Sequence, residues 1–162
     1  MARDIVFHVP HDQELLAALG AVALRHEHLN YMLRMTIRAV TGVTVQEAID
    51  ATTRESSSQL RERVRKLARS RLGEGASLIK LQAILERCKR AAEKRNDLVH
   101  SVWATGFYGD GPVRLGDGGV LHPQPTAADL RALADEIELL TKELIGAKID
   151  GFLAEALENS RD

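Results

Sequence analysis

The sequence predicts an all-α protein: an up-and-down four-helix-type bundle with an extra short helix and a small β-hairpin or loop insertion before the last helix. Two observations support this fold class. Apolar residues recur at intervals of three, four or seven through long segments of the chain, and strand-like patterning is confined to one stretch rich in glycine and proline. A length of 162 residues suits one domain that buries a core without disulfides or metal. We therefore expect residues 1–162 to form a single domain.

The first long helix is expected over residues 12–40. Asp12 is a suitable N-cap residue and Gly42 a suitable stop. His26 and Thr36 occupy positions at which the helical spacing calls for an apolar side chain. The apolar stripe of this helix comprises Leu15, Leu19, Val22, Leu29, Leu33 and Val40.

Capping signals divide most of the remaining chain into helices. Thr44 and Glu47 form a capping-box pattern that opens a short helix. Ser56 and the two serines after it precede a basic helix over residues 59–72. The segment from Thr126 to Asp129 caps the last helix. The apolar stripe of that last helix comprises Leu130, Leu133, Ile137, Leu140 and Leu144.

A third long helix is expected over residues 78–102. Arg95 is the only charged residue in its apolar stripe, and an unpaired charge in a protein interior is costly. Arg95 must therefore be paired or must face an interface. The stripe reads Leu78, Leu81, Leu85, Cys88, Ala92, Arg95, Val99 and Val102.

Residues 104–125 form an insertion of different character. They contain six of the twelve glycines and three of the four prolines. Two short apolar fragments, residues 113–115 and 120–121, are separated by a glycine-rich stretch. This pattern favours a small β-hairpin or an ordered loop.

Composition excludes several classes of protein. Cys88 is the only cysteine, so the chain forms no internal disulfide and has no Cys/His spacing for structural zinc. The N-terminus lacks the pattern of a signal peptide, and no apolar run approaches the ~20 residues of a membrane span. We expect a cytoplasmic protein with no membrane, metal or cofactor.

The net charge of −1 hides a strong segregation of charge. Residues 60–95 contain 12 basic and 4 acidic residues, a net charge of +8, whereas residues 126–162 have a net charge of −5. One interpretation is a solvated basic face that pairs with the acidic last helix. The other is a surface that binds a polyanion such as RNA. The candidate RNA-binding residues are Arg61, Arg65, Lys66, Arg69 and Trp103.

The end of the third long helix has the clearest chemical pattern. Asn96 and His100 are four residues apart and share a helix face. Arg95, Asn96 and His100 together resemble the Arg-x(4–6)-His motif of the HEPN superfamily, in which a polar residue, often Asn, follows the arginine. The position near the end of the penultimate long helix of a bundle is similar as well.

This resemblance implies a homodimer in which two copies of the motif meet in one cleft and cleave RNA without metal. By carry-over, the catalytic residues are Arg95, Asn96 and His100. His100 would act as general base on the 2′-hydroxyl or would protonate the leaving oxygen. Arg95 would stabilise the scissile phosphate and Asn96 would orient His100 or the phosphate. The resemblance also implies a toxin or defence role and an antitoxin or nucleotidyltransferase partner.

Two alternatives stay open at this point. One is a non-catalytic HEPN-like module for dimerisation or binding in a toxin-antitoxin or nucleotidyltransferase system. The other is an unrelated bundle in which Arg95 and His100 only stabilise the carboxyl end of their helix.

Residues outside the motif are candidates for supporting roles. His26, Glu27 and Asn30 are candidates to face the Arg95 and His100 cleft. His26 and His28 are two residues apart, so they point to different sides of a helix and lack the spacing of a zinc motif. Trp103 lies among the aromatics that follow the motif, and either packs the insertion onto the bundle or stacks on a base beside His100.

Overall fold

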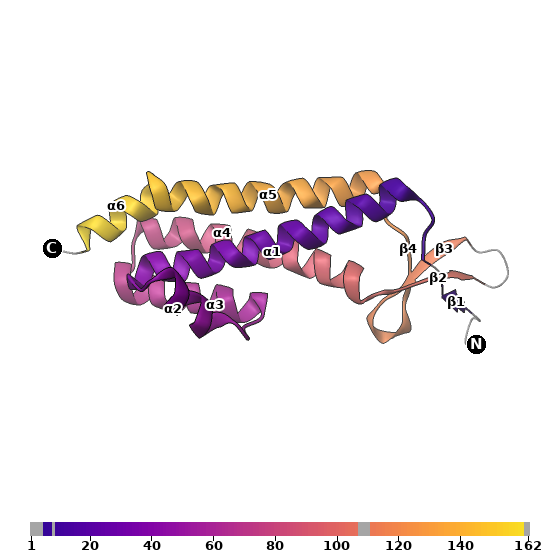
Figure 1. Cartoon of the computed structure of the whole chain (residues 1–162), viewed down its shortest axis with the longest axis horizontal. Coiled ribbons are helices and arrows are strands. Elements are labelled where there is room, and N and C mark those ends of the chain that lie inside the picture. The colour runs from indigo at the N-terminus through magenta and orange to yellow at the C-terminus, as the bar shows by residue number, and fades with distance from the viewer. Residues whose placement is uncertain (1–4, 8, 107–110, 161–162) are drawn as a thin grey trace.

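The computed structural model describes residues 5–7, 9–106 and 111–160. It is an elongated helical bundle with a small sheet at one end and the C-terminus at the other (Figure 1). The predicted fold class is confirmed. The helices are α1 (Gln13–Thr41), α2 (Val45–Thr52), α3 (Ser57–Leu72), α4 (Ala76–His100), α5 (Ala127–Ile149) and α6 (Phe152–Asn159).

Local capping chemistry fixes most helix starts at the predicted residues. The Asp12 carboxylate accepts hydrogen bonds from the backbone N–H groups of Glu14 and Leu15 at the start of α1. Gly42 ends this helix in the left-handed region, with φ of 76°. Reciprocal capping boxes open three further helices, and the residue pairs are Thr44 and Glu47, Ser56 and Gln59, and Thr126 and Asp129.

Helix α4 ends at His100, two residues earlier than predicted. Ser101 adopts an extended backbone conformation, and Val102 begins a strand. Val99 and Val102 are 42% and 39% exposed, whereas Leu98 is buried. The stripe prediction was wrong at both valines. Val99 lies off the buried face because a strict 3.5-residue repeat drifts around a helix with 3.6 residues per turn, and Val102 lies beyond the end of the helix.

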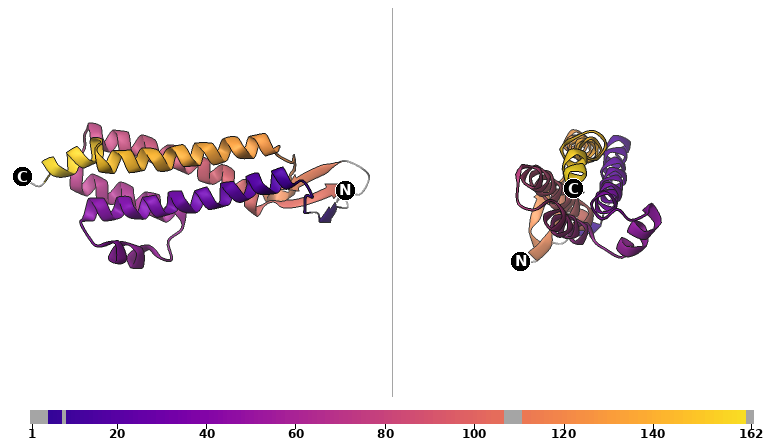
Figure 2. Two further views of the ribbon diagram at one scale, coloured as in Figure 1. Left: turned by 45° about the horizontal axis from the view of Figure 1, so that its top comes forward. Right: turned by 90° about the vertical axis from the view of Figure 1, so that its left-hand side faces the viewer.

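The four long helices pack in the order α1, α3, α4 and α5 around one apolar core (Figure 2). Ion pairs give the directions of neighbouring helices. Glu14 pairs with Arg131 and Arg25 pairs with Glu138, so α1 and α5 run parallel. Helices α4 and α5 run antiparallel, as shown by the ion pairs Arg87–Glu143 and Lys94–Glu136. The short α2 returns the chain between α1 and α3.

The core contains most residues of the predicted stripes, together with Leu60, Val64 and Ala68 of α3, for which no stripe was predicted. Cys88 is buried in it, and burial raises the pKa of this thiol to about 12. None of the helices in the described ranges is long and apolar enough to cross a membrane.

The insertion contributes to a sheet that is larger than predicted. Its four antiparallel strands are β1 (Ile5–Phe7), β2 (Val102–Gly106), β3 (Pro112–Leu115) and β4 (Leu121–Pro123), in that spatial order. The β3–β4 hairpin agrees with the prediction. The N-terminal strand β1 was not predicted, because a three-residue strand has too short a pattern to stand out.

The sheet adjoins the end of α4 because β2 follows that helix after a single residue. Cross-strand partners connect the three strands from β2 to β4: Trp103 pairs with Arg114, and Arg114 pairs with His122. Directly opposed residues point to the same face of a sheet. Trp103, Arg114 and His122 therefore form one row of side chains.

Candidate functional site

Arg95 is half-buried on α4 and bonds to its neighbour in the motif. One Arg95 Nη1 hydrogen bond goes to Asn96 Oδ1 at 3.1 Å. The Arg95 Nε is buried and has no hydrogen-bond partner among the described residues. A buried guanidinium N–H without a partner is uncommon in proteins, so this atom has free capacity to donate.

A second group of polar side chains lies on α1, within its apolar stripe. His26 is only 3% exposed, and its Nδ1 lies 3.7 Å from Glu27 Oε1. Asn30 Nδ2 donates to the same Glu27 oxygen at 3.3 Å. The three predicted supporting residues therefore lie together around the Glu27 carboxylate.

Electrostatics connect this group to Arg95. Burial lowers the pKa of His26, and the positive charge of Arg95 lowers it further. Glu27 opposes this shift, and the Arg61 guanidinium at the start of α3 adds a smaller downward effect. His26 is therefore a neutral imidazole at pH 7. Side chains from α1, α3 and α4 act on the buried His26 imidazole, and we call this group the buried polar cluster after His26 and Asn30, its two buried members. The Glu27 side chain is 63% exposed. The members are His26, Glu27, Asn30, Arg61 and Arg95.

His100 is exposed at the last residue of α4 and lines a separate pocket. The pocket has a volume of about 440 Å³. Asn96 lines it as well, so Asn96 contacts Arg95 with its oxygen and forms a wall of the His100 pocket. The complete lining is Glu93, Asn96, Asp97, His100, Ser101 and Asp117.

The sheet closes the end of α4 through Arg114. This arginine is 8% exposed, and its Nη1 donates to the backbone oxygen of Asp97 at 3.1 Å and to the Asp97 carboxylate at 2.9 Å. The same nitrogen is 2.9 Å from Ser101 Oγ, and Arg114 Nε donates to the Pro123 carbonyl at 3.4 Å. Ser101 Oγ in turn donates to the Asp97 carbonyl.

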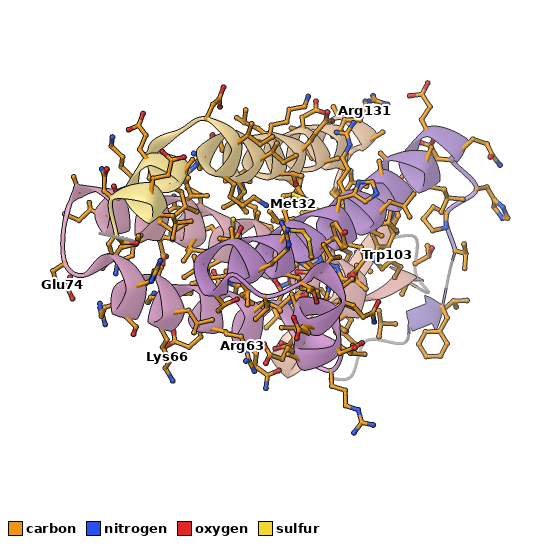
Figure 3. The ribbon with its side chains drawn as sticks, turned by 60° about the vertical axis from the view of Figure 1, so that its left-hand side comes forward. Met32, Arg63, Lys66, Glu74, Trp103 and Arg131 are labelled. Atoms are coloured by element: carbon orange, nitrogen blue, oxygen red, sulfur yellow. The ribbon has the colours of Figure 1, made fainter. Side chains whose placement is uncertain are left out.

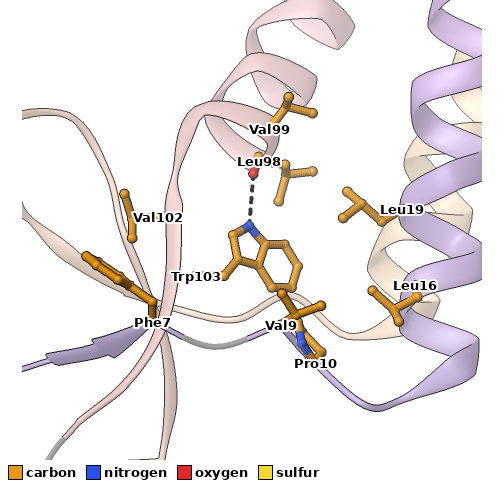
Figure 4. Close-up of a pocket in the computed structure, with 9 residues that line it drawn as sticks. All are labelled: Phe7, Val9, Pro10, Leu16, Leu19, Leu98, Val99, Val102 and Trp103. Carbon is orange, nitrogen blue, oxygen red and sulfur yellow. Dashed lines mark hydrogen bonds between the residues drawn. The ribbon is translucent and has the colours of Figure 1, made fainter.

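Trp103 packs the sheet onto the bundle. Because α4 ends at His100, Trp103 lies on β2 and not on the helix face of His100. Its indole N–H donates to the Leu98 carbonyl at 3.0 Å (Figure 4). The ring lines an apolar pocket of about 480 Å³ where the sheet meets α1 and α4, and does not line the His100 pocket. Phe107 and Tyr108, the other aromatics after the motif, lie outside the described residues.

Three of the basic residues of α3 pair with nearby acids; Figure 3 labels Arg63 and Lys66 on this helix. Arg63 pairs with Glu55, Arg65 with Glu62 at 2.6 Å, and Arg69 with Glu74 at 2.9 Å. Arg61 donates to Ser57 Oγ at 2.8 Å, and Lys66 is exposed.

The expected pairing of these bases with the last helix is not present in the described part of the chain. The α5 acids pair instead with α1 and α4, because these two helices flank α5: their partners include Arg25, Arg87 and Lys94. The basic face of α3 is therefore not neutralised by the acidic helix.

Comparison with protein-family models, curated proteins and solved structures gives no match to this chain. In the described ranges, no group of three or more His, Cys, Asp and Glu side chains is arranged to hold a metal ion.

Sequence reasoning missed the side chains that surround His100. Glu93 and Asp97 precede His100 by seven and three residues, a spacing that places them on its helix face, so the pattern was available. Asp117 and Arg114 come from the insertion, and no local pattern in the sequence indicates which helix they contact. The structure thus adds three carboxylates that line the His100 pocket, Glu93, Asp97 and Asp117, which we call the acidic rim. It also adds Arg114, which binds the last turn of α4.

Proposed function

We propose that this protein is a metal-independent endoribonuclease of the HEPN type, acting as a homodimer. The observation that carries the proposal is the position of Arg95, which reaches from the buried polar cluster to Asn96, a wall of the His100 pocket. A cation, an amide and an imidazole are thereby available near the end of α4. Cleavage by an internal hydroxyl needs an acid, a base and charge neutralisation, and these groups supply them.

The reaction follows from these roles. His100 accepts the proton of the 2′-hydroxyl, and the 2′-oxygen forms a bond to phosphorus. The bond from phosphorus to the 5′-oxygen breaks, and that oxygen leaves with a proton from water or from the second copy's imidazole. The products are a 2′,3′-cyclic phosphate and a 5′-hydroxyl. Arg95 stabilises the additional negative charge on the phosphate as the 2′-oxygen attacks.

The surface beside His100 supports pairing of two copies. Val99 and Val102 are partly exposed next to the motif, and Phe7 is 78% exposed on the neighbouring strand. Burial of such side chains is the usual driving force for association. The carboxylates of the His100 pocket repel phosphate in a single copy, so a second copy's Arg95 is needed to reverse the local charge.

A second candidate function is a non-catalytic binding module for an antitoxin or nucleotidyltransferase. The acidic rim favours this alternative, because Glu93, Asp97 and Asp117 surround His100 in the pocket. Such a rim suits a lysine or arginine of a partner protein better than it suits RNA.

Cleavage of single-stranded RNA in excess EDTA separates the two functions. We expect the wild-type protein to produce 2′,3′-cyclic ends, and Arg95→Ala and His100→Ala to lower the rate at least about 100-fold. His28→Ala is the matched control, because His28 is an exposed histidine of α1 outside the cluster. It should retain the wild-type rate.

Two results contradict the proposal. If the wild-type protein leaves the RNA intact, the protein is not a ribonuclease. If all variants cleave RNA at the same rate, the activity comes from a contaminating nuclease. Light scattering at micromolar concentration tests the dimer independently, and a monomer there rejects the composite site.

A further inference from the structure

We propose that Arg114, a residue of the sheet, is a positioning residue that holds His100 in place for the proposed ribonuclease reaction. The inference rests on the proposed function for its catalytic consequence. Its structural content, the clamping of the last turn of α4 by the sheet, is independent of whether RNA is the substrate.

The row of side chains formed by Trp103, Arg114 and His122 faces the end of α4. Trp103 and Arg114 both donate to helix carbonyls there, to Leu98 O and Asp97 O respectively. His122 lies close to the same end, since a Cβ added at Gly116 would be 3.2 Å from His122 Nε2 and 3.8 Å from Asp97 Oδ1. The sheet therefore serves as the cap of this helix.

A cap is needed because the last four carbonyls of an α-helix have no partner within the helix. Helix α4 ends without the left-handed glycine that closes α1, because Ser101 continues directly into the extended backbone. Arg114 and Trp103 supply partners for two of the four carbonyls. Arg114 is also nearly fully buried, and a buried guanidinium requires such acceptors.

The clamp acts on residues on both sides of His100. Asp97 is held at its backbone oxygen and its carboxylate, and Ser101 is held at its hydroxyl. These residues lie three positions before and one position after His100, and both line its pocket. His100 is itself exposed, so its position depends on the backbone of this turn rather than on packing of its ring.

Loss of the clamp should therefore fray the last turn and displace the imidazole. A misplacement of about 1 Å lowers a rate by as much as about 100-fold. We expect Arg114→Ala to lower kcat for RNA cleavage by about 10- to 100-fold while KM changes by less than about threefold, because the basic face that binds RNA is untouched. Arg114→Lys keeps one donor and should recover part of kcat.

Two measurements do not depend on cleavage. Amide hydrogen exchange of residues 97–100 should become faster in Arg114→Ala, while exchange in the middle of α4 is unchanged. The imidazole NMR signals of His100 should shift. Arg131→Ala is the control, because Arg131 is exposed on α5 and pairs with Glu14 of α1 at 3.6 Å, so its loss removes no contact with the last turn of α4.

Asp97→Asn is a second variant in case Arg114→Ala fails to fold. It weakens the ion pair but keeps the backbone acceptor, so it should produce the same changes on a smaller scale. Unchanged exchange and unchanged His100 signals in either folded variant overturn the clamp. A kcat equal to that of wild type, together with altered exchange, overturns the catalytic role. A wild-type protein that leaves RNA intact, yet shows the changes in exchange and in the His100 signals, rejects the ribonuclease while supporting the clamp.

Discussion

Two residues that interrupt apolar stripes, His26 and Arg95, carry most of the chemical information in this chain. Each lies at a position where the helical spacing calls for an apolar side chain. The structure places both in one buried polar cluster, where the charge of Arg95 lowers the pKa of His26. Thr36, the third interruption, instead donates its hydroxyl to the Met32 carbonyl of its own helix.

The buried imidazole of His26 should make folding stability depend on pH. Its pKa is lowered by burial and by Arg95, so the unfolded chain takes up a proton more readily than the folded one. The contribution of the neutral His26 to the free energy of unfolding is therefore fully present above the unfolded pKa, near 6.5, and decreases as the pH falls below that value. The slope contributed by one such group is at most about 1.4 kcal/mol per pH unit.

Thermal unfolding measured between pH 7.5 and pH 5 tests this dependence. We expect the melting temperature to fall less steeply in His26→Gln than in the wild-type protein. His28→Gln serves as the control, because His28 is exposed. Equal slopes for the wild type and His26→Gln would show that His26 titrates as a solvent-exposed histidine does.

At the scale of elements, the junction between α5 and α6 depends on one glycine. A Cβ at Gly151 would lie 2.8 Å from the Gly146 carbonyl oxygen and 3.0 Å from Ala147 Cα, both backbone atoms. Backbone cannot move aside cheaply, so Gly151→Ala should destabilise the protein by about 1–3 kcal/mol.

Gly20 provides the matched comparison for this substitution. It lies in the middle of α1, and a Cβ there would meet no heavy atom within 4 Å. Gly20→Ala should therefore stabilise the protein by about 1 kcal/mol through helix propensity. Urea denaturation of both variants measures the two changes. The two changes in the free energy of unfolding need not be equal in size, but stabilisation by Gly151→Ala would refute the steric argument.

Elements were predictable where the signal is local. Capping residues such as Asp12 and Thr44 fix helix starts through bonds to backbone only two or three residues away, and these starts agree with the structure. The end of α4 was misplaced because it depends on Arg114, which lies 13 residues beyond Ser101 in the chain. The acidic rim around His100 likewise requires Asp117, whose approach to α4 is set by sheet pairing.

At the scale of the whole molecule, the net charge of −1 conceals two segments of opposite charge, residues 60–95 and residues 126–162. The acids of α5 are engaged by Arg25, Arg87 and Lys94 from its neighbours. The bases of α3 form short-range pairs and leave Lys66 exposed. Arg61 at the start of this helix belongs to the buried polar cluster, and its charge acts on His26.

We therefore predict that RNA binding weakens as the salt concentration rises, and that the steepness of this dependence increases with the number of α3 cations that contact phosphate. Each phosphate contact on a single strand contributes about 0.7 to the slope of log affinity against log salt concentration. Removing Arg65 and Lys66 together, as Arg65→Ala with Lys66→Ala, should therefore flatten the slope by about 1.4 and weaken binding to all sequences alike. The binding should be measured with His100→Ala in the background, so that cleavage does not consume the RNA.

The control removes one cation from the other charged surface. Lys142 is an exposed cation of α5, and Lys142→Ala should leave both the affinity and the salt slope unchanged. If the α3 variant and the α5 variant behave alike, RNA is attracted by the molecule as a whole and not by the basic helix. If only the α3 variant shows a smaller dependence of affinity on salt, RNA reaches Arg95 along the basic helix α3.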